Sequence, residues 1–309
     1  MAKKSQTVKE ITQIVVFLLI VGILTLVFVI YPLNRTKAIL ARPDIGDFNP
    51  DSLPPNDISA LVDLHAAIDT FRVDADGLTS LAGVYLAPMP DSNLPQTPKG
   101  LAILLHGEGE DRNSMLPLTR ALLDSGFAVC LYDQRASGRS TGAYHSDGEF
   151  EAGDLTEVIA YLRIRDRIIS PFVIVGQRAG ADAALLAAST DQSPDGVVAI
   201  SPYITTDRWL DILQDEHDMY WIPFSHTVFT FWYELRSGYA PEGRSLETLR
   251  PPRCRTLILD SEDRLADETM TGYVQLSTNS MVTTAPLPAD SNRMLDAVLA
   301  FISSLPATK

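Results

Sequence analysis

The sequence predicts an α/β fold: a mostly parallel sheet flanked by helices, with a small aromatic cap insertion and one transmembrane helix in front. Three observations support this prediction. An uncharged apolar run fills residues 11–30. Short apolar runs typical of buried strands recur with helical patterns between them. Near the middle, a turn with glycines at both ends, Gly176–Gly180, joins such a strand to an Ala- and Leu-rich helix.

The strands are expected in a definite order along the chain. Phe71–Leu86 predicts two antiparallel strands that are joined at Asp76-Gly77. Further strands are expected over Gly100–Leu105, Gly126–Tyr132, Phe172–Val175, Gly196–Ile200, from Thr256 onward and over Met281–Thr284. Helices are expected around Leu116–Leu123, after Gly180 and over Asn292–Leu305.

The turn at Gly176–Gly180 has the glycine spacing of a nucleophile elbow, G-x-S-x-G. In such an elbow a strained turn lifts one side chain above the edge of the sheet. Arg178 occupies the nucleophile's place here. A guanidinium stays protonated and has no lone pair free to attack a carbonyl, so Arg178 cannot act as the nucleophile.

These elements, taken in this order with the His106-Gly107 turn and the Asp133–Ser140 loop, resemble the α/β-hydrolase superfamily. The resemblance covers roughly Phe71–Leu305 and is strongest to lysophospholipase, esterase and serine-aminopeptidase-like members. It implies that the backbone N–H groups of Glu108 and Ala179 are the donors of an oxyanion hole.

The resemblance also implies positions for a catalytic acid and base. The segment Thr256–Asp263 matches the family pattern L-x-G-x-x-D, with Asp263 as the acid and Asp260 in the glycine's place. The base is expected between Pro288 and Asp290, and Asp290 is the predicted occupant, because no histidine follows His226. A triad that lacks both nucleophile and base loses nearly all of its activity, so ordinary serine-hydrolase activity is not expected.

Arg178 is instead the candidate binding residue. It stands at a helix amino terminus beside two N–H donors, an arrangement that favours an anion such as the carboxylate or phosphate of an amphipathic ligand. Alternatively, Asp263 or Asp290 pairs with Arg178, or the charge is neutralised inside a filled pocket. A competing hypothesis is an active hydrolase that uses Ser201 or Ser140 as its nucleophile.

A cap insertion is expected at about residues 203–250. It holds the three tryptophans, Trp209, Trp221 and Trp232, among other aromatic residues. These side chains are candidates for lining an apolar ligand site or for contact with a membrane interface. Packing of the cap onto the core would explain them equally well.

The predicted organisation is a basic tail (1–10), a transmembrane helix (11–30), a linker (31–60) and the hydrolase-like domain (61–309). Twenty apolar residues suffice to cross a bilayer and favour an uncleaved signal anchor, so the membrane is the expected partner. Three basic residues precede the span and three follow closely, so charge does not fix the orientation. We expect a single-pass protein with its soluble domain outside the cytoplasm.

Composition excludes some function classes. The net charge of -14 disfavours nucleic acid as a partner, because phosphate binding requires clustered positive charge. The five histidines and two cysteines show no spacing typical of a metal site. Neither a metal nor an organic cofactor is expected.

Overall fold

The computed structural model describes most of the chain, namely residues 2–40, 61, 64, 66–89, 97–190, 194–217, 219, 221, 222, 224–237, 244–277 and 281–306. These residues fall into two compact units. The smaller unit contains residues 1–41 and 210–241, and the larger contains residues 42–209 and 242–309. Most of the segment expected as a linker, residues 41–60, lies outside the described residues.

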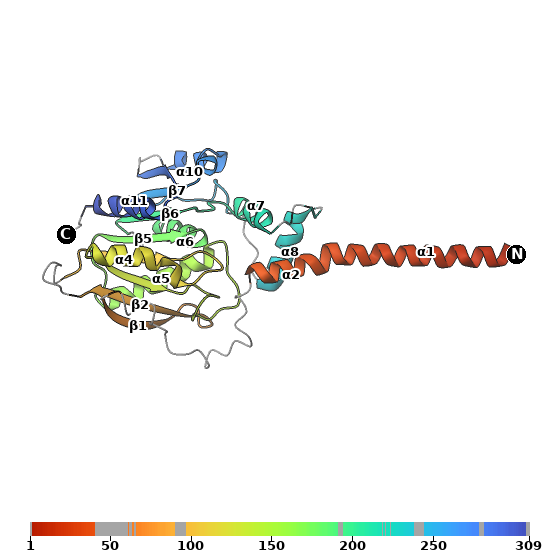
Figure 1. Cartoon of the computed structure of the whole chain (residues 1–309), viewed down its shortest axis with the longest axis horizontal. Helices are drawn as coiled ribbons and strands as arrows, with labels where there is room; N and C mark the ends of the chain where they lie inside the picture. Colours follow the sequence, from red (N-terminus) through yellow and green to blue (C-terminus); the bar gives the residue numbers. More distant parts are fainter. Residues whose placement is uncertain are drawn as a thin grey trace. The chain divides into compact units, whose positions relative to one another are not determined.

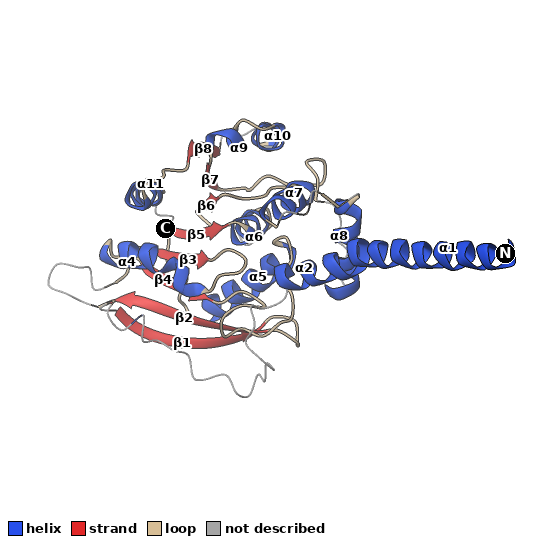
Figure 2. Cartoon of the chain, turned by 45° about the vertical axis from the view of Figure 1, so that its right-hand side comes forward, coloured by secondary structure: helices blue, strands red, loops and turns tan. Residues whose placement is uncertain are grey.

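The larger unit is built on one eight-stranded sheet with the strand order β1-β2-β4-β3-β5-β6-β7-β8 (Figure 2). The pairs β1·β2 and β2·β4 are antiparallel, and all later pairs are parallel. The strands are β1 (Ala66–Asp74), β2 (Ser80–Pro88), β3 (Leu101–Leu105), β4 (Ala128–Tyr132), β5 (Phe172–Gln177), β6 (Gly196–Ile200), β7 (Arg255–Asp260) and β8 (Val282–Pro286).

Helices cover both faces of this sheet, as the buried central strands require. In β3, Leu101, Ile103 and Leu105 belong to one hydrophobic core, and the alternate residues Ala102 and Leu104 to a second. Helices α5 (Glu149–Ile164), α6 (Ala179–Ala188) and α10 (Glu268–Leu276) contribute to the first core. Helices α4 (Leu116–Asp124) and α11 (Ser291–Ser303) contribute to the second.

Short helices complete the larger unit. A 3-10 turn, η3 (Arg112–Met115), precedes α4, and α9 (Glu262–Leu265) follows β7. Within the region expected as a cap, α7 (Thr206–Glu216) begins in the larger unit, and α8 (Ser225–Ser237) belongs to the smaller one.

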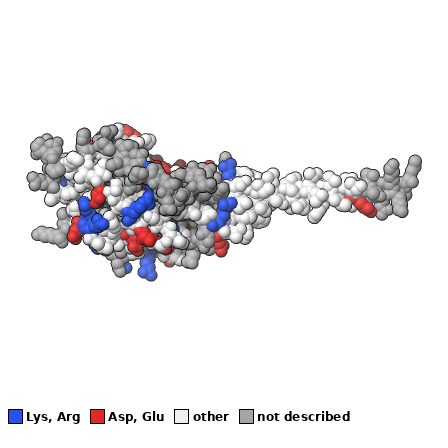
Figure 3. Space-filling model, turned by 90° about the horizontal axis from the view of Figure 1, so that it is seen from below, with Lys and Arg blue, Asp and Glu red and all other residues white. Residues whose placement is uncertain are grey.

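The smaller unit contains the amino-terminal helices. Helix α1 (Ala2–Thr25) continues through a π-helical turn, η1 (Leu26–Ile30), into α2 (Tyr31–Leu40), as Figure 1 shows in red. Over residues 9–36 this helix is long and apolar enough to cross a membrane. Its surface carries no charge from Ile11 to Asn34, which Figure 3 shows as a white stretch. Residues 2–10 and 31–40, expected as tail and linker, are helical here.

The architecture confirms the predicted fold class: a mostly parallel sheet, helices on both faces and one apolar amino-terminal helix. The parallel register also aligns the carboxyl ends of the central strands. Leu105 pairs with Gly176, and Gln177 pairs with Ile200. The loops that follow β3, β5 and β6 therefore meet at one edge of the sheet, where the elbow lies.

Candidate functional site

The elbow is a tight turn between β5 and α6. Arg178 adopts φ 51° and ψ -120°, a strained conformation for a residue with a side chain, and its N–H donates to the carbonyl of Ile200 at 2.9 Å. A Cβ added at Gly176 would lie 2.2 Å from the Gly180 carbonyl oxygen, and one at Gly180 would lie 2.5 Å from that of His106. Both glycines are therefore needed for the close approach of strand, helix and neighbouring loop.

The Arg178 side chain is neutralised by Glu108. Arg178 Nε and Nη2 each lie 2.5 Å from Glu108 Oε1. The Tyr203 hydroxyl donates to the same oxygen, and its ring lies 5.5 Å from the Arg178 guanidinium carbon. The backbone N–H of Ala179 donates to the other oxygen, Glu108 Oε2, at 3.2 Å. One internal carboxylate thus takes one of the two N–H groups expected to hold an oxyanion, that of Ala179.

His106 holds the loop from which Glu108 reaches the elbow. The ring is fully buried, and its Nε2 accepts the backbone N–H of Gln134 at 2.9 Å. This leaves the ring proton on Nδ1, which lies 2.7 Å from the Gly107 carbonyl oxygen. The Gln134 amide donates in turn to the His106 carbonyl. His106 therefore joins the loops after β3 and β4 and is inaccessible to a substrate.

The partner of Arg178 differs from the one expected from the sequence. Asp263 is exposed in the first turn of α9, and Asp290 caps α11 by accepting the N–H of Asn292 at 2.9 Å. Among the ion pairs of the described residues, the one involving Arg178 is with Glu108. The reason is topological: β3 is the direct neighbour of β5, so the loop after β3 reaches the elbow first.

A group of four charged side chains lies at the carboxyl end of β7, close in sequence to the predicted acid. Asp260 is contacted by Arg264 Nε at 3.3 Å and by Arg208 Nη2 at 3.6 Å, and Arg208 also pairs with Asp267 at 3.0 Å. Arg264 Nη2 donates to the Pro202 carbonyl at 2.9 Å. Burial raises the pKa of Asp260 despite both arginines. This group ties the loops after β6 and β7 together.

Neither alternative nucleophile lies beside a histidine in the described residues. Residues 138–142 also have the letters of G-x-S-x-G, centred on Ser140, but they form a loop after β4, where no strand meets a helix. The Ser140 hydroxyl is buried, donates to the Asp133 carbonyl and accepts the N–H of Ala82 at 2.9 Å. Ser201 is half-buried, has φ 51°, and its hydroxyl bonds to Asp260.

One serine–histidine contact occurs outside the elbow. Ser137 Oγ lies 3.3 Å from His145 Nε2, and His145 Nδ1 lies 3.8 Å from Glu151. Ser137 has no exposed surface, and burial lowers the pKa of His145. The Glu151 carboxylate already accepts both the N–H and the hydroxyl of Ser146. The contact stabilises the loop that precedes α5 and offers no access to a substrate.

Asp182 is a site residue that sequence reasoning missed. It lies one turn after Arg178 and accepts the backbone N–H groups of Tyr203 and Ile204, each at 2.8 Å. Arg244 Nη2 lies 3.1 Å from it. Burial raises the pKa of Asp182 to about 6, against the lowering effect of Arg244. Asp182 fixes the loop that brings Tyr203 onto Glu108, and a lone acid in an Ala-rich helix was the available signal.

The tryptophans expected to line a ligand site occupy different environments. Trp209 is buried within the larger unit at 2% exposure. Trp221 and Trp232 belong to the smaller unit, where both contact the amino-terminal helix.

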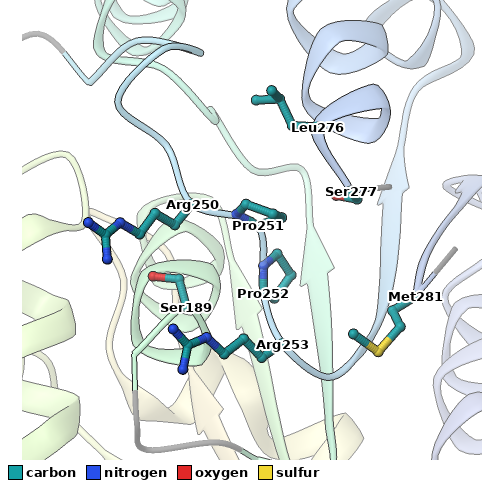
Figure 4. A pocket seen from close by; sticks show the side chains of 8 residues that line it. All are labelled: Ser189, Arg250, Pro251, Pro252, Arg253, Leu276, Ser277 and Met281. Atoms are coloured by element: carbon teal, nitrogen blue, oxygen red, sulfur yellow. The ribbon is translucent and has the colours of Figure 1, made fainter. Parts of the chain in front are cut away.

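A cavity of about 410 Å³ lies far from the elbow (Figure 4). It adjoins Ser189, just past the end of α6, and the segment before β7. The ten residues of α6 place it about 15 Å from Arg178. Its lining is Ser189, Arg250, Pro251, Pro252, Arg253, Leu276, Ser277 and Met281. In the described part of the chain, no group of three or more His, Cys, Asp or Glu side chains is arranged to hold a metal ion.

Two sequence comparisons find matches over part of the chain. Residues 96–224 match the family model of serine aminopeptidase, S33. The uncharacterized protein YqkD of Bacillus subtilis (strain 168) is 30% identical over 162 residues, which are 52% of this chain and 50% of that protein. The chain thus matches half the length of this curated relative.

Two solved structures show the same arrangement of the fold. The esterase Pf2001 of Pyrococcus furiosus has a TM-score of 0.63 at 20% identity and covers 86% of this chain and 98% of its own. Est1E from Butyrivibrio proteoclasticus, solved with ferulic acid bound, has a TM-score of 0.53 at 16% identity and covers 76% and 98%. At such identities the likeness concerns the fold alone. Together with the sheet order and the strained turn at Arg178, it shows that the chain has the α/β-hydrolase fold.

Proposed function

We propose that this chain is a membrane-anchored protein that does not hydrolyse substrates through its elbow and instead binds an anionic, amphipathic molecule there. The observation that carries the proposal is the position of the Glu108 carboxylate. It is held by the Arg178 guanidinium, the Tyr203 hydroxyl and the Ala179 N–H. These are the donors of a complete carboxylate receptor, and Glu108 is its resting occupant.

Hydrolysis at this site is opposed by two independent features. Arg178 has no lone pair with which to attack a carbonyl. The Ala179 N–H, which would stabilise a developing oxyanion, is already bonded to a carboxylate. A negative charge fixed beside that N–H would also repel a second one.

Binding of an external anion is supported by the exposure of the pair. The Arg178 side chain is 32% exposed and that of Glu108 is 12% exposed. An incoming carboxylate or phosphate can therefore replace Glu108 and use the same donors once Glu108 turns toward solvent. Such exchange costs less at a part-exposed pair than at a buried one, because water solvates the released carboxylate.

Thermal unfolding of the detergent-solubilised full chain tests this proposal, with octanoate and octyl phosphate as anionic probes and octanol as the uncharged control. Glu108→Ala vacates the receptor, so both anions should raise the melting temperature of this variant more than that of the unchanged protein. The gain should disappear when Arg178→Met is added. Glu157→Ala, which removes an exposed glutamate of α5, is the matched control. If Glu108→Ala and Glu157→Ala respond equally, the site does not bind anions.

The proposal includes attachment to a membrane through residues 11–30, with the soluble domain outside the cytoplasm. Support comes from the amino-terminal helix, which is long and apolar enough to span a bilayer. A reporter fused after Lys309 that matures only after export should be active, and one that works only in the cytoplasm should be silent. The reverse pattern would place the domain in the cytoplasm.

An active hydrolase that uses Ser201 is the second candidate. It is favoured over Ser140 because Ser201 is half-buried and its hydroxyl contacts the carboxylate of Asp260, whose pKa is raised. The full chain would then release product from short-chain acyl esters or aminoacyl amides, and Ser201→Ala would abolish that release. We expect no turnover above that of the heat-denatured protein.

A further inference from the structure

The amino-terminal helix has an irregular turn at the end of its apolar run. In an α-helix the carbonyl of Phe28 would accept the N–H of residue 32, but that residue is Pro32, which has none. The helix passes through a π-helical turn here, Leu26–Ile30. Trp232 of α8 donates its indole Nε1–H to the Phe28 carbonyl at 3.1 Å. A residue more than 200 positions away thus donates to this carbonyl.

A second contact joins the same two segments. The rings of Tyr31 and Trp221 meet edge to face, with centroids 5.1 Å apart. Arg35 follows one turn later, with its guanidinium carbon 5.3 Å from the Tyr31 ring centroid. All of these residues belong to one compact unit. The cap helix α8 and the turn before it are therefore held at the carboxyl end of the apolar run.

The cap exposes large apolar side chains at this place. The cap face, as we define it, consists of Trp221, Phe224, Phe231 and Leu235, which are between 55% and 79% exposed. Phe231 and Leu235 are four residues apart and share one side of α8. Phe229 and Tyr233 of the same helix are fully buried. The helix thus has an inner apolar side and a second, exposed apolar side.

We propose that the cap face rests in the headgroup region of a phospholipid bilayer. Phe28 belongs to the last three residues of the run Ile11–Ile30, whose large apolar side chains are mostly exposed as a lipid-facing helix requires. Side chains bound at that point lie at the bilayer surface, where Trp and Tyr are favoured and where Arg35 can meet lipid phosphates. The bond from the Trp232 indole to the Phe28 carbonyl holds α8 at this depth.

The inference rests on the membrane anchor proposed above and goes beyond it by placing the cap. Alkaline carbonate extraction tests the anchor alone, because a spanning helix resists extraction whether or not the cap touches lipid. The placement of the cap is tested separately, on protein that remains in the membrane after extraction.

Site-directed fluorescence is the experiment. The full chain is reconstituted into phosphatidylcholine vesicles with an environment-sensitive fluorophore on Phe231→Cys, Leu235→Cys or Ile164→Cys. Ile164 is the matched control, an apolar side chain of the larger unit that is 83% exposed. The two native thiols, Cys130 and Cys254, are buried. Bromines near the lipid headgroup should quench the labels at 231 and 235 about threefold more than the label at 164, and aqueous iodide should do the reverse.

Two other outcomes would overturn the placement. If iodide quenches all three labels equally, the cap face points to water. If neither quencher reaches positions 231 and 235, protein covers the face, either a second copy or a partner.

The carbonyl contact has its own test. Trp232→Phe removes the indole donor and should increase iodide access to the label on Phe231→Cys. Unchanged iodide access in this variant would show that the indole bond does not hold the cap.

Discussion

Two arginine–carboxylate contacts lie one helical turn apart at the start of α6, and they differ in exposure. The Arg178 and Glu108 side chains are 32% and 12% exposed. Those of Arg244 and Asp182 are 8% and 2% exposed. A part-exposed pair can exchange its partner for a solute, whereas a buried pair cannot without leaving an uncompensated charge. On the proposed function, the same turn therefore carries one exchangeable contact, Arg178–Glu108, and one fixed contact, Arg244–Asp182.

The fixed contact supports the exchangeable one. Asp182 accepts the N–H groups of Tyr203 and Ile204, which holds the loop after β6 close to α6. The Tyr203 hydroxyl then donates to Glu108. Changes at Asp182 should therefore act mainly on stability, and changes at Glu108 or Arg178 should act mainly on binding.

The largest effect is expected from Asp182→Ala. This change leaves Arg244 without its nearest carboxylate and removes the acceptor of two buried N–H groups. The free energy of unfolding should fall by about 3 to 5 kcal/mol. Urea unfolding of the solubilised chain measures the loss, with Asp296→Ala, an exposed aspartate of α11, as the control that changes it by less than about 0.5 kcal/mol. Similar losses in both variants would remove the distinction between the two contacts.

Stability should also depend on pH through Asp182. Burial raises its pKa to about 6 in the folded chain, whereas an unfolded aspartate titrates near about 3.9. The folded state then binds more protons between these values, so the free energy of unfolding falls as pH rises from about 4 to about 6. Asp154, whose pKa burial also raises to about 6, adds to this slope.

Comparison with Asp182→Asn isolates the contribution of Asp182. The variant should lose less stability than the unchanged protein over this pH range, because its amide does not titrate. Measurements by urea unfolding at half-unit intervals from pH 4 to pH 7 are sufficient. Parallel curves for the two proteins would mean that Asp182 keeps an ordinary pKa.

A smaller effect is expected at the exchangeable pair. In a double-mutant cycle of Arg178→Met and Glu108→Gln, the coupling energy should be about 1 to 2 kcal/mol, between the values for exposed and buried pairs. The same cycle with Arg178→Met and Asp263→Asn should show no coupling, since Asp263 is exposed on α9. Coupling to Asp263 and none to Glu108 would restore the pairing expected from the sequence.

Much of the fold could be predicted because local signals were sufficient. Apolar runs located the central strands to within one or two residues, as at Phe172–Gln177 and Gly196–Ile200. The elbow followed from two glycines, since a Cβ at Gly176 or Gly180 would collide with backbone. At the elbow, the sequence pattern and the steric reason for it depend on the same two glycines.

The charges around the elbow could not be predicted in the same way. The sequence indicates a role only for the backbone N–H of Glu108, and the family pattern points to Asp263 and Asp290 as partners of Arg178. Which carboxylate lies beside Arg178 depends on the order of the strands in the sheet. In that order β3 lies beside β5, although 66 residues separate Leu105 from Phe172. The contact of Trp232 with Phe28 spans 204 positions and leaves no local signal at all.

The smallest effect is expected from Arg178→Ser, which restores the nucleophile's side chain and should restore no hydrolysis. A serine at the elbow needs a base to take its proton and free N–H donors for the oxyanion. The Ala179 N–H would still be bonded to Glu108, whose charge opposes a developing oxyanion. Adding Glu108→Gln removes that charge but supplies no base, so the double variant should be inactive as well. A burst of nitrophenol from a p-nitrophenyl ester in either variant would show that the elbow retains a base, and the proposed loss of hydrolysis would then rest on Arg178 alone.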